Sequence, residues 1–203
     1  MKIICIGLNY KKHAMEMGMT LPTEPIVFLK PDSSILKNNK PFFLPGFSSM
    51  IQYEAEIIIK ISKLGKGIPV KYAHRYYDEL TVGIDITARD IQSRNITAGL
   101  PWELSKGFDG AAPLGRFIPV SSFTDINNIN FRLEINGNVV QMANTSDMIF
   151  NVDEIIAYLS EFFTLKTGDL IFTGTPSGVG TLKKKDNLVA FIEDDPLLDF
   201  MIR

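Results

Sequence analysis

Short apolar runs rich in β-branched residues recur along the chain, and helical patterns do not alternate with them. Such runs are typical of buried strands, whereas regular alternation with helices would predict a doubly wound parallel sheet. The expected strands are residues 2–6, 26–29, 56–61, 81–87, 131–135, 139–142, 169–172 and 188–192. The sequence therefore predicts an α+β fold that is predominantly β, with a few peripheral helices.

Helical signals are fewer. The clearest runs from Val152 to Phe163, where Asn151 and Glu154 have capping-box spacing and the apolar residues form one face. Weaker signals run from Tyr10 to Met17, closed by a glycine, and from Val70 to Glu79.

Two turns matter for the strand pairing. Asn136-Gly137 can supply the two positive φ values of a type I′ turn, so a hairpin is expected there. The segment Glu193-Asp-Asp-Pro196 follows the last strand signal, where a glycine-containing turn is expected. The pairing of the C-terminal strand therefore stays open.

Length and charge limit the class of protein. The 203 residues, 45% of them hydrophobic, suit a single domain covering residues 1–203. The net charge is −2, and the longest basic run, Lys183 to Lys185, is too short for a nucleic-acid footprint. We expect a small-molecule partner and no nucleic acid.

Cysteine use and hydropathy indicate the compartment. A single cysteine, Cys5, lies in an apolar run, which excludes an intrachain disulfide and fits a reducing environment. No signal-peptide pattern is present, and no stretch approaches the roughly 20 apolar residues that span a bilayer. We expect a cytoplasmic protein that does not associate with membranes.

Two glutamates stand at the head of the most apolar strand. Strand side chains alternate between faces, so Glu54 and Glu56 should point the same way. Two neighbouring carboxylates raise each other's pKa and are costly to bury without a cation. Either this is an edge strand with a wet face, or the two carboxylates bind a metal.

Asp85 interrupts another expected strand and adds a third carboxylate. With Glu54 and Glu56 it forms the oxygen-only set that Mg²⁺ prefers, whereas the absence of a cysteine cluster or paired histidines argues against zinc. The alternative is structural, because Asp85 could pair with Arg89 or cap a short helix that begins there.

His13 and Glu16 lie three positions apart in an expected helix, so they share a face. The carboxylate could polarise the imidazole, or the two could together take a proton from water. A solvated helix face is the alternative, since such pairs are common at surfaces. His74 has no comparable partners and is interpreted as structural.

Two further segments are candidates for ligand binding. The loop Thr173-Gly-Thr-Pro-Ser-Gly-Val-Gly180 could bring backbone N–H groups close to an anion, although it lacks the ending of a Walker loop. Lys106 stands in a glycine-flanked segment, where a surface position is the ordinary expectation. A plain turn and a surface lysine are therefore the alternatives.

Taken together, these segments resemble the fumarylacetoacetate hydrolase family, in particular its short acylpyruvase-like members, over nearly the whole chain. The motifs that carry the resemblance are Asn9-Tyr10 with His13 and Glu16, Phe28-Leu-Lys-Pro31, Tyr53-Glu-Ala-Glu56, Asp85-Ile-Thr-Ala-Arg-Asp-Ile-Gln92, Ser105-Lys-Gly-Phe-Asp109, and the 173–180 loop.

The resemblance implies a mixed β-roll that usually forms a homodimer. It implies Mg²⁺, or Mn²⁺, bound by the residues Glu54, Glu56 and Asp85. It also implies a catalytic dyad on a mobile lid, formed by His13 and Glu16, and a substrate pocket that contains Lys106, Arg89, Gln92 and Thr175.

The expected activity is metal-dependent hydrolysis of a C–C bond in an acylpyruvate, a 2-oxo acid, to pyruvate and a carboxylic acid. Glu16, helped by His13, would deprotonate the attacking water while Lys106 steadies the oxyanion, and a divalent ion would stabilise the pyruvate enolate. Decarboxylation of oxaloacetate and enol–keto isomerisation use the same enolate and stay open. A binding protein without turnover is a further alternative.

Overall fold

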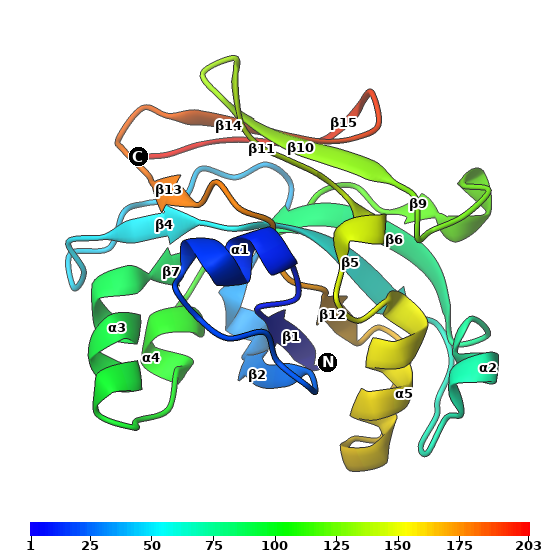
Figure 1. Cartoon of the computed structure of the whole chain (residues 1–203). Helices are drawn as coiled ribbons and strands as arrows, with labels where there is room; N and C mark the ends of the chain where they lie inside the picture. The colour runs from blue at the N-terminus through cyan, green and yellow to red at the C-terminus, as the bar shows by residue number, and fades with distance from the viewer.

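The computed structural model describes all residues from Met1 to Arg203, and strands are its main elements. The six-stranded sheet has the order β2 (Ile26–Lys30), β1 (Ile3–Gly7), β12 (Leu170–Phe172), β5 (Ala55–Ile61), β6 (Tyr77–Ile84), β9 (Ile118–Pro119). The four-stranded sheet has the order β11 (Asn138–Asn144), β10 (Asn130–Ile135), β14 (Asn187–Ile192), β15 (Asp195–Met201). Figure 1 shows this second sheet lying across the top of the molecule.

The structure also contains two small sheets. One has the order β13 (Gly180–Thr181), β4 (Ile51–Tyr53), β7 (Thr87–Ala88), and the other pairs β3 (Ile35–Leu36) with β8 (Ala112–Pro113). The β1–β12 and β3–β8 pairs are parallel and the remaining pairs are antiparallel, so the fold is mixed. The predicted fold class, predominantly β, is confirmed.

Strand β5 is central, because it pairs with β12 on one side and β6 on the other. Ile57 and Ile59 face the main core between the sheets, whereas Ile58 packs into a smaller cluster on the opposite face with Cys5 and Phe172. Burial on both faces explains why Ile57, Ile58 and Ile59 follow one another without polar alternation.

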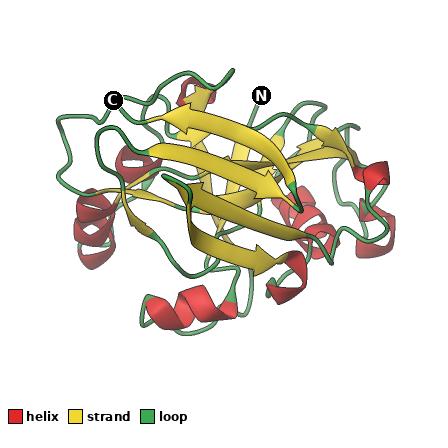
Figure 2. Cartoon of the chain, turned by 90° about the horizontal axis from the view of Figure 1, so that it is seen from above, coloured by secondary structure: helices red, strands yellow, loops and turns green.

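The helices lie around the sheets (Figure 2). They are α1 (Lys11–Glu16), α2 (Val70–Ala73), α3 (Arg89–Thr97), α4 (Glu103–Lys106) and α5 (Val152–Phe162), with 3₁₀ turns at Asp32–Ser34, Val120–Ser122 and Thr145–Asp147. The capping box between Asn151 and Glu154 is present at the start of α5, as predicted. None of these helices is long and apolar enough to span a bilayer.

One helix prediction is wrong in its extent. The signal from Val70 to Glu79 yields a helix only to Ala73, and from Tyr77 the chain forms β6. Tyr77 pairs with Ile61 of β5 and is buried, so sheet pairing and burial outweigh the local helix preference.

Both turns are closed hairpins. The turn Asn136-Gly137 joins β10 to β11 with positive φ at both residues, as predicted. The segment after β14 also forms a tight turn, in which Glu193 takes φ 49° and Ile192 pairs with Asp195. The C-terminal strand β15 therefore pairs with β14 without the expected glycine.

Candidate active site

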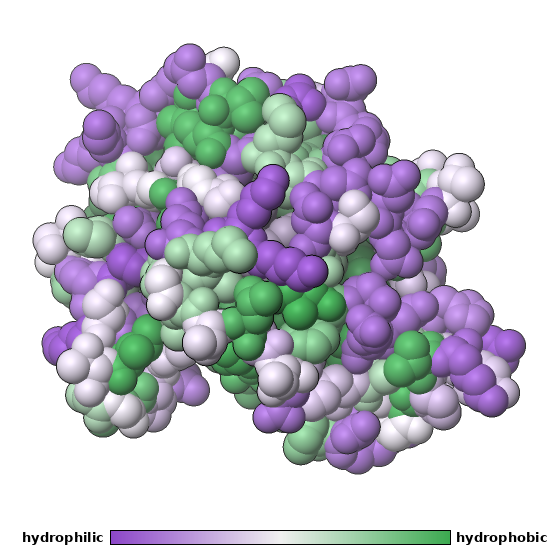
Figure 3. Space-filling model, viewed as in Figure 1, coloured by the Kyte–Doolittle hydropathy of each residue, from purple (hydrophilic) through white to green (hydrophobic).

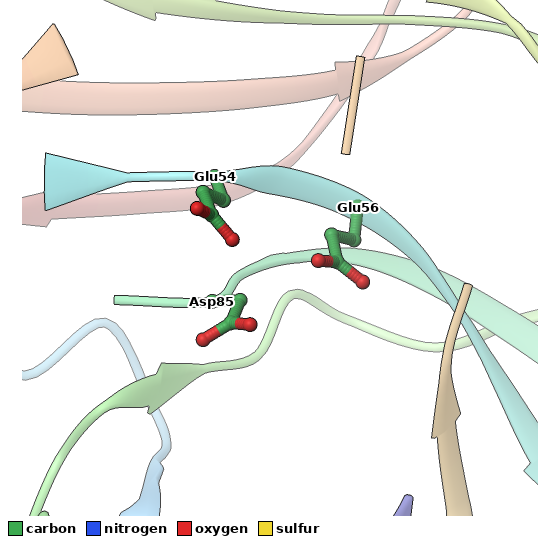
Figure 4. Close-up of side chains that lie close together, drawn as sticks. All are labelled: Glu54, Glu56 and Asp85. Atoms are coloured by element: carbon green, nitrogen blue, oxygen red, sulfur yellow. The ribbon is translucent and has the colours of Figure 1, made fainter. Parts of the chain in front are cut away.

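Three buried carboxylates lie close together at the start of β5 and just after the end of β6 (Figure 4). Ala55 pairs with Ile84 and Glu56 with Gly83, so Asp85 follows directly on the β6 side, and the Asp85 N–H donates to the Glu54 carbonyl at 2.7 Å. One oxygen of each carboxylate lies within 4.8 Å of an oxygen of the others. The triad is buried and β5 is a central strand, so the wet edge strand is excluded.

Three cations from different elements surround the triad. Lys106, at the end of α4, donates from Nζ to Glu54 Oε2 at 2.7 Å, Asp85 Oδ2 at 2.8 Å and the Thr87 hydroxyl at 2.7 Å. Arg89 pairs with the other oxygen of Glu54. Lys106 is only 2% exposed, so the expectation of a surface lysine is wrong, because its three acceptors lie inside the protein.

The third cation is Lys30, at the end of β2. Its Nζ lies 2.7 Å from Asp85 Oδ1 and donates to the carbonyls of Lys106 and Ala111. Asp85 is therefore paired with lysines and not with Arg89, which corrects the structural alternative considered for it. Lys30 belongs to the motif Phe28-Leu-Lys-Pro31, but no role was predicted for it, although a lysine closing an apolar strand was a usable signal.

Glu56 differs from the other two carboxylates because it forms no ion pair. Its polar contact is with the Gly174 N–H, which donates to Oε2 at 2.7 Å. Burial, together with the charges of Asp85 and Glu54, raises the pKa of Glu56 well above its usual range. Burial also tends to raise the pKa of Glu54, but the positive charges of Lys106 and Arg89 outweigh this effect and lower the pKa of that carboxyl.

These features fit a divalent cation. The donor set is three hard carboxylate oxygens, and one buried carboxylate has no cation of the chain beside it. A metal ion at this point would supply the missing charge. Which residues ligate it stays a prediction.

His13 lies on α1 and lines the same cavity as the triad. It is 5% exposed, and its Nδ1 lies 3.1 Å from Glu16 Oε2. The Gly178 N–H, in the glycine-rich loop, reaches both oxygens of Glu16 at 3.1 and 3.2 Å. The helix face that carries His13 is therefore buried, and the solvated-face alternative does not hold for the imidazole.

A cavity of about 50 Å³ joins these groups. It is lined by His13, Glu54, Glu56, Asp85, Arg89, Gln92, Lys106 and Thr175, and on its apolar side by Ile6, Gly7, Leu8, Met17, Met19, Phe28, Ile96 and Trp102. Of the predicted site residues, only Glu16 does not line it. Figure 3 shows hydrophobic residues just below α1 in a face that is otherwise mostly hydrophilic.

The other predicted binding residues are fixed by contacts within the protein. Arg89 donates to the Gln92 side chain and, through Nε, to Gln52 Oε1 at 2.7 Å. The Thr175 hydroxyl donates to the Ala55 carbonyl at 2.9 Å. A larger cavity of about 550 Å³, which Met1, Lys60 and Phe117 help to line, contains none of the predicted residues.

Sequence reasoning missed residues that support the site. Gln52 orients Arg89, and Gln141 of β11 contacts both Ala55 and Thr175. Asn9 links the end of β1 to Phe150 and to the Thr173 carbonyl. Each is a polar residue beside an apolar run, but only the tertiary fold reveals what it contacts.

The chain matches the family described as Fumarylacetoacetate (FAA) hydrolase C-terminal over residues 2–198. The chain belongs to this family.

Other members of the fumarylacetoacetate hydrolase family have named activities. The mitochondrial oxaloacetate decarboxylase of Dictyostelium discoideum is 41% identical over 206 residues, covering 100% of this chain and 94% of that protein. The oxaloacetate tautomerase of Escherichia coli is 38% identical over 197 residues, covering 97% and 90%.

Solved structures of the family have the same fold. A fumarylpyruvate hydrolase from Pseudomonas aeruginosa, in complex with Mn²⁺ and pyruvate, superposes with a TM-score of 0.94 at 33% identity, covering 100% of this chain and 89% of that one. A family protein from Yersinia pestis gives a TM-score of 0.96 at 36% identity, covering 100% and 93%.

Proposed function

We propose that the chain is a metal-dependent enzyme that interconverts the keto and enol forms of a 2-oxo acid, with oxaloacetate as the substrate. The observation that supports this best is the position of His13. Its ring lines the cavity beside the carboxylates while Nδ1 is engaged by Glu16, which leaves Nε2 free to exchange a proton with a ligand. The named activity of the E. coli relative points the same way.

Glu54, Glu56 and Asp85 would hold Mg²⁺ or Mn²⁺. A divalent ion bound there would draw electron density from the 2-oxo group and make the C3 proton of the substrate more acidic. His13 Nε2 takes this proton from C3 and returns it to the 2-oxo oxygen, which converts the keto form to the enol. Glu16 holds the ring through Nδ1 and stabilises the protonated imidazole.

The remaining site residues orient the substrate. Arg89 commits three of its five N–H groups to Gln52, Gln92 and Glu54, which leaves two for a substrate carboxylate. Gln92 holds the guanidinium in place. Thr175, which belongs to the glycine-rich loop 173–180, borders the cavity and would lie beside the substrate.

Hydrolysis of an acylpyruvate is the second candidate, supported by the name of the P. aeruginosa relative. In that reaction Glu16 and His13 deprotonate water, and Lys106 stabilises the oxyanion. All three N–H donors of Lys106 are engaged by protein oxygens, which favours proton transfer over this route. Decarboxylation, named for the D. discoideum relative, needs neither an attacking water nor an oxyanion donor.

A substrate panel separates these reactions. Purified chain with Mg²⁺ or Mn²⁺ would be assayed against oxaloacetate, for enol absorbance and released CO₂, and against acetylpyruvate and fumarylpyruvate, for released pyruvate. We expect tautomerisation of oxaloacetate that chelator abolishes. Release of pyruvate from the acylpyruvates alone would establish the hydrolase instead, and binding without any turnover would identify a binding protein.

Two variants test the role of His13. His13→Ala should lower tautomerisation by about 10²- to 10⁴-fold, the usual effect of losing a general base. Glu16→Gln should cost far less, because the amide oxygen still accepts from Nδ1. Equal losses from both substitutions would indicate that Glu16 itself moves the proton, as hydrolysis requires.

A homodimer is proposed on the family resemblance and on one apolar surface. Phe47 and Leu104 are 54% and 71% exposed and border a hollow of about 320 Å³ with Ile91 and Phe108. Apolar groups gathered in this way are typical of interfaces between copies of a chain. Light scattering should give twice the chain mass, and Leu104→Glu should halve it, whereas Val139→Glu should not.

The cytoplasm is the proposed location. Cys5 is buried and unpaired, which fits a reducing compartment. Relatives from D. discoideum and mouse are named as mitochondrial, so members of the family differ in compartment. Cell fractionation with an antibody to the native chain would test this.

A further inference from the structure

A closed ring of hydrogen bonds lies behind the carboxylate triad. The Ala55 N–H donates to Gln141 Oε1 at 2.9 Å, and Gln141 Nε2 donates to the Thr175 hydroxyl at 3.0 Å. The Thr175 hydroxyl in turn donates to the Ala55 carbonyl at 2.9 Å. Gln141 Nε2 also donates to the Pro176 carbonyl at 3.0 Å, and the Gln141 side chain is 2% exposed.

The ring holds both sides of the triad. Ala55 is the residue between Glu54 and Glu56, and both of its backbone polar groups are fixed by the ring. Thr175 follows Gly174, whose N–H orients the Glu56 carboxylate. Gln141 belongs to β11 in the four-stranded sheet, so one side chain ties the second sheet to the site.

The chemistry of the ring requires an amide. Glutamine supplies an acceptor for the Ala55 N–H and two N–H groups for Thr175 and Pro176, and every one is used. An apolar side chain of the same length would leave buried backbone groups without partners, and hydrogen bonds in a closed ring strengthen one another. Because the Thr175 hydroxyl already donates its proton to the Ala55 carbonyl, it can form a hydrogen bond with a ligand only as an acceptor.

We propose that Gln141 is a positioning residue for the carboxylate triad, which sets the geometry of Glu54 and Glu56 through Ala55. This inference rests on the proposed metal-binding role of the triad. Residues that orient metal ligands typically change metal affinity about 10- to 100-fold when they are replaced.

Calorimetric titration with Mn²⁺ tests the proposal, together with hydrogen exchange of the Ala55 amide in metal-free protein. Gln141→Met should weaken Mn²⁺ binding about 10- to 100-fold and speed exchange at Ala55. Thr175→Val should also weaken Mn²⁺ binding and speed exchange at Ala55, whereas Thr175→Ser, which keeps the hydroxyl, should leave both close to wild type. The double variant Gln141→Met with Thr175→Val should bind Mn²⁺ no more weakly than the weaker of the two single variants. Met142→Ala, on the same strand but 66% exposed, is the matched control.

Two results would overturn the inference. One is an Mn²⁺ affinity within twofold of wild type in folded Gln141→Met. The other is a double variant whose loss of Mn²⁺ affinity equals the product of the losses caused by Gln141→Met and Thr175→Val alone. A lowered melting temperature with unchanged affinity and exchange would indicate a purely structural glutamine and would equally count against it. If Gln141→Met does not fold, the Thr175→Val and Thr175→Ser pair decides. A wild-type chain that binds Mn²⁺ but turns over no 2-oxo acid would contradict the proposed function alone.

Discussion

At the scale of single residues, Glu56 is the carboxylate of the triad that no cation of the chain contacts. We predict that Glu56→Gln weakens Mg²⁺ or Mn²⁺ binding by more than about 100-fold, because it removes a charged ligand. The same change should stabilise the metal-free protein by about 1–3 kcal/mol, since a buried like charge disappears. Titration calorimetry and urea unfolding in chelator measure the two effects.

A metal ligand is distinguished from a structural carboxylate when Glu56→Gln weakens metal binding but raises the free energy of unfolding of the metal-free protein. Glu79→Gln is the control, because Glu79 lies at the other end of β6 and forms a half-exposed pair with Lys60. It should change the free energy of unfolding by less than about 0.5 kcal/mol. If Glu56→Gln destabilised the metal-free protein, the carboxylate would be structural.

Lys30 is a buried counter-ion for Asp85, and it also satisfies backbone carbonyls. Lys30→Met should lower the free energy of unfolding by about 3–5 kcal/mol in chelator, because it leaves a buried carboxylate with one cation fewer. Saturating Mg²⁺ should recover part of this loss by replacing the charge. Urea unfolding with and without metal measures both, and Lys12→Met, on an exposed lysine, should have little effect.

At the scale of elements, one carboxylate ties the start of α3 to the loop that precedes β4. Burial alone would raise the pKa of Asp90, but hydrogen bonds, including those from Ser48 and Ser49, lower it to about 2. The folded pKa lies below the ordinary value of 3.8, so the stabilisation is complete above about pH 4 and is lost as pH falls toward 2.

We therefore predict that Asp90→Asn costs about 1 kcal/mol of unfolding free energy at pH 7, discounted because the group is partly exposed. The difference from wild type should shrink as the pH is lowered below 4. Urea titrations between pH 7 and 3 measure it. Asp78→Asn, at an exposed position without hydrogen-bonded partners, should show no such trend, and a constant difference for Asp90→Asn would contradict the assigned cause.

Elements whose signals are local could be predicted from the sequence. The capping box of α5 and the turn Asn136-Gly137 each depend on a few adjacent residues, and both are confirmed. Strand β6 begins four residues after α2 because Tyr77 pairs with Ile61 of β5, a partner outside the local window that favours a helix. Strand β15 pairs with the adjacent β14 through a tight turn that contains no glycine, so the turn lacks the residue signal that would have predicted it.

At the scale of the whole molecule, the main core joins residues from the six-stranded sheet, the four-stranded sheet and α5. We predict a single unfolding transition, as expected for one domain. Mg²⁺ at about 100 times its dissociation constant should stabilise the protein by about 2.7 kcal/mol and raise Tm by roughly 5–10 °C. Differential scanning calorimetry measures this, and two separate transitions, or a shift in only part of the signal, would contradict the single domain.

The sequence by itself determined the predominantly β class, the strands with alternating glutamates, and the family motifs, because these depend on residue type and short-range periodicity. The tertiary structure decided which groups meet. It brought Lys30 and Lys106 to the carboxylates from separate segments, left Glu56 without a cation, and placed Gln141 behind Ala55. The reason is physical: burial and hydrogen bonding join residues that are far apart in sequence. Glu56 and Gly174 are 118 positions apart, and no local pattern encodes such a pair.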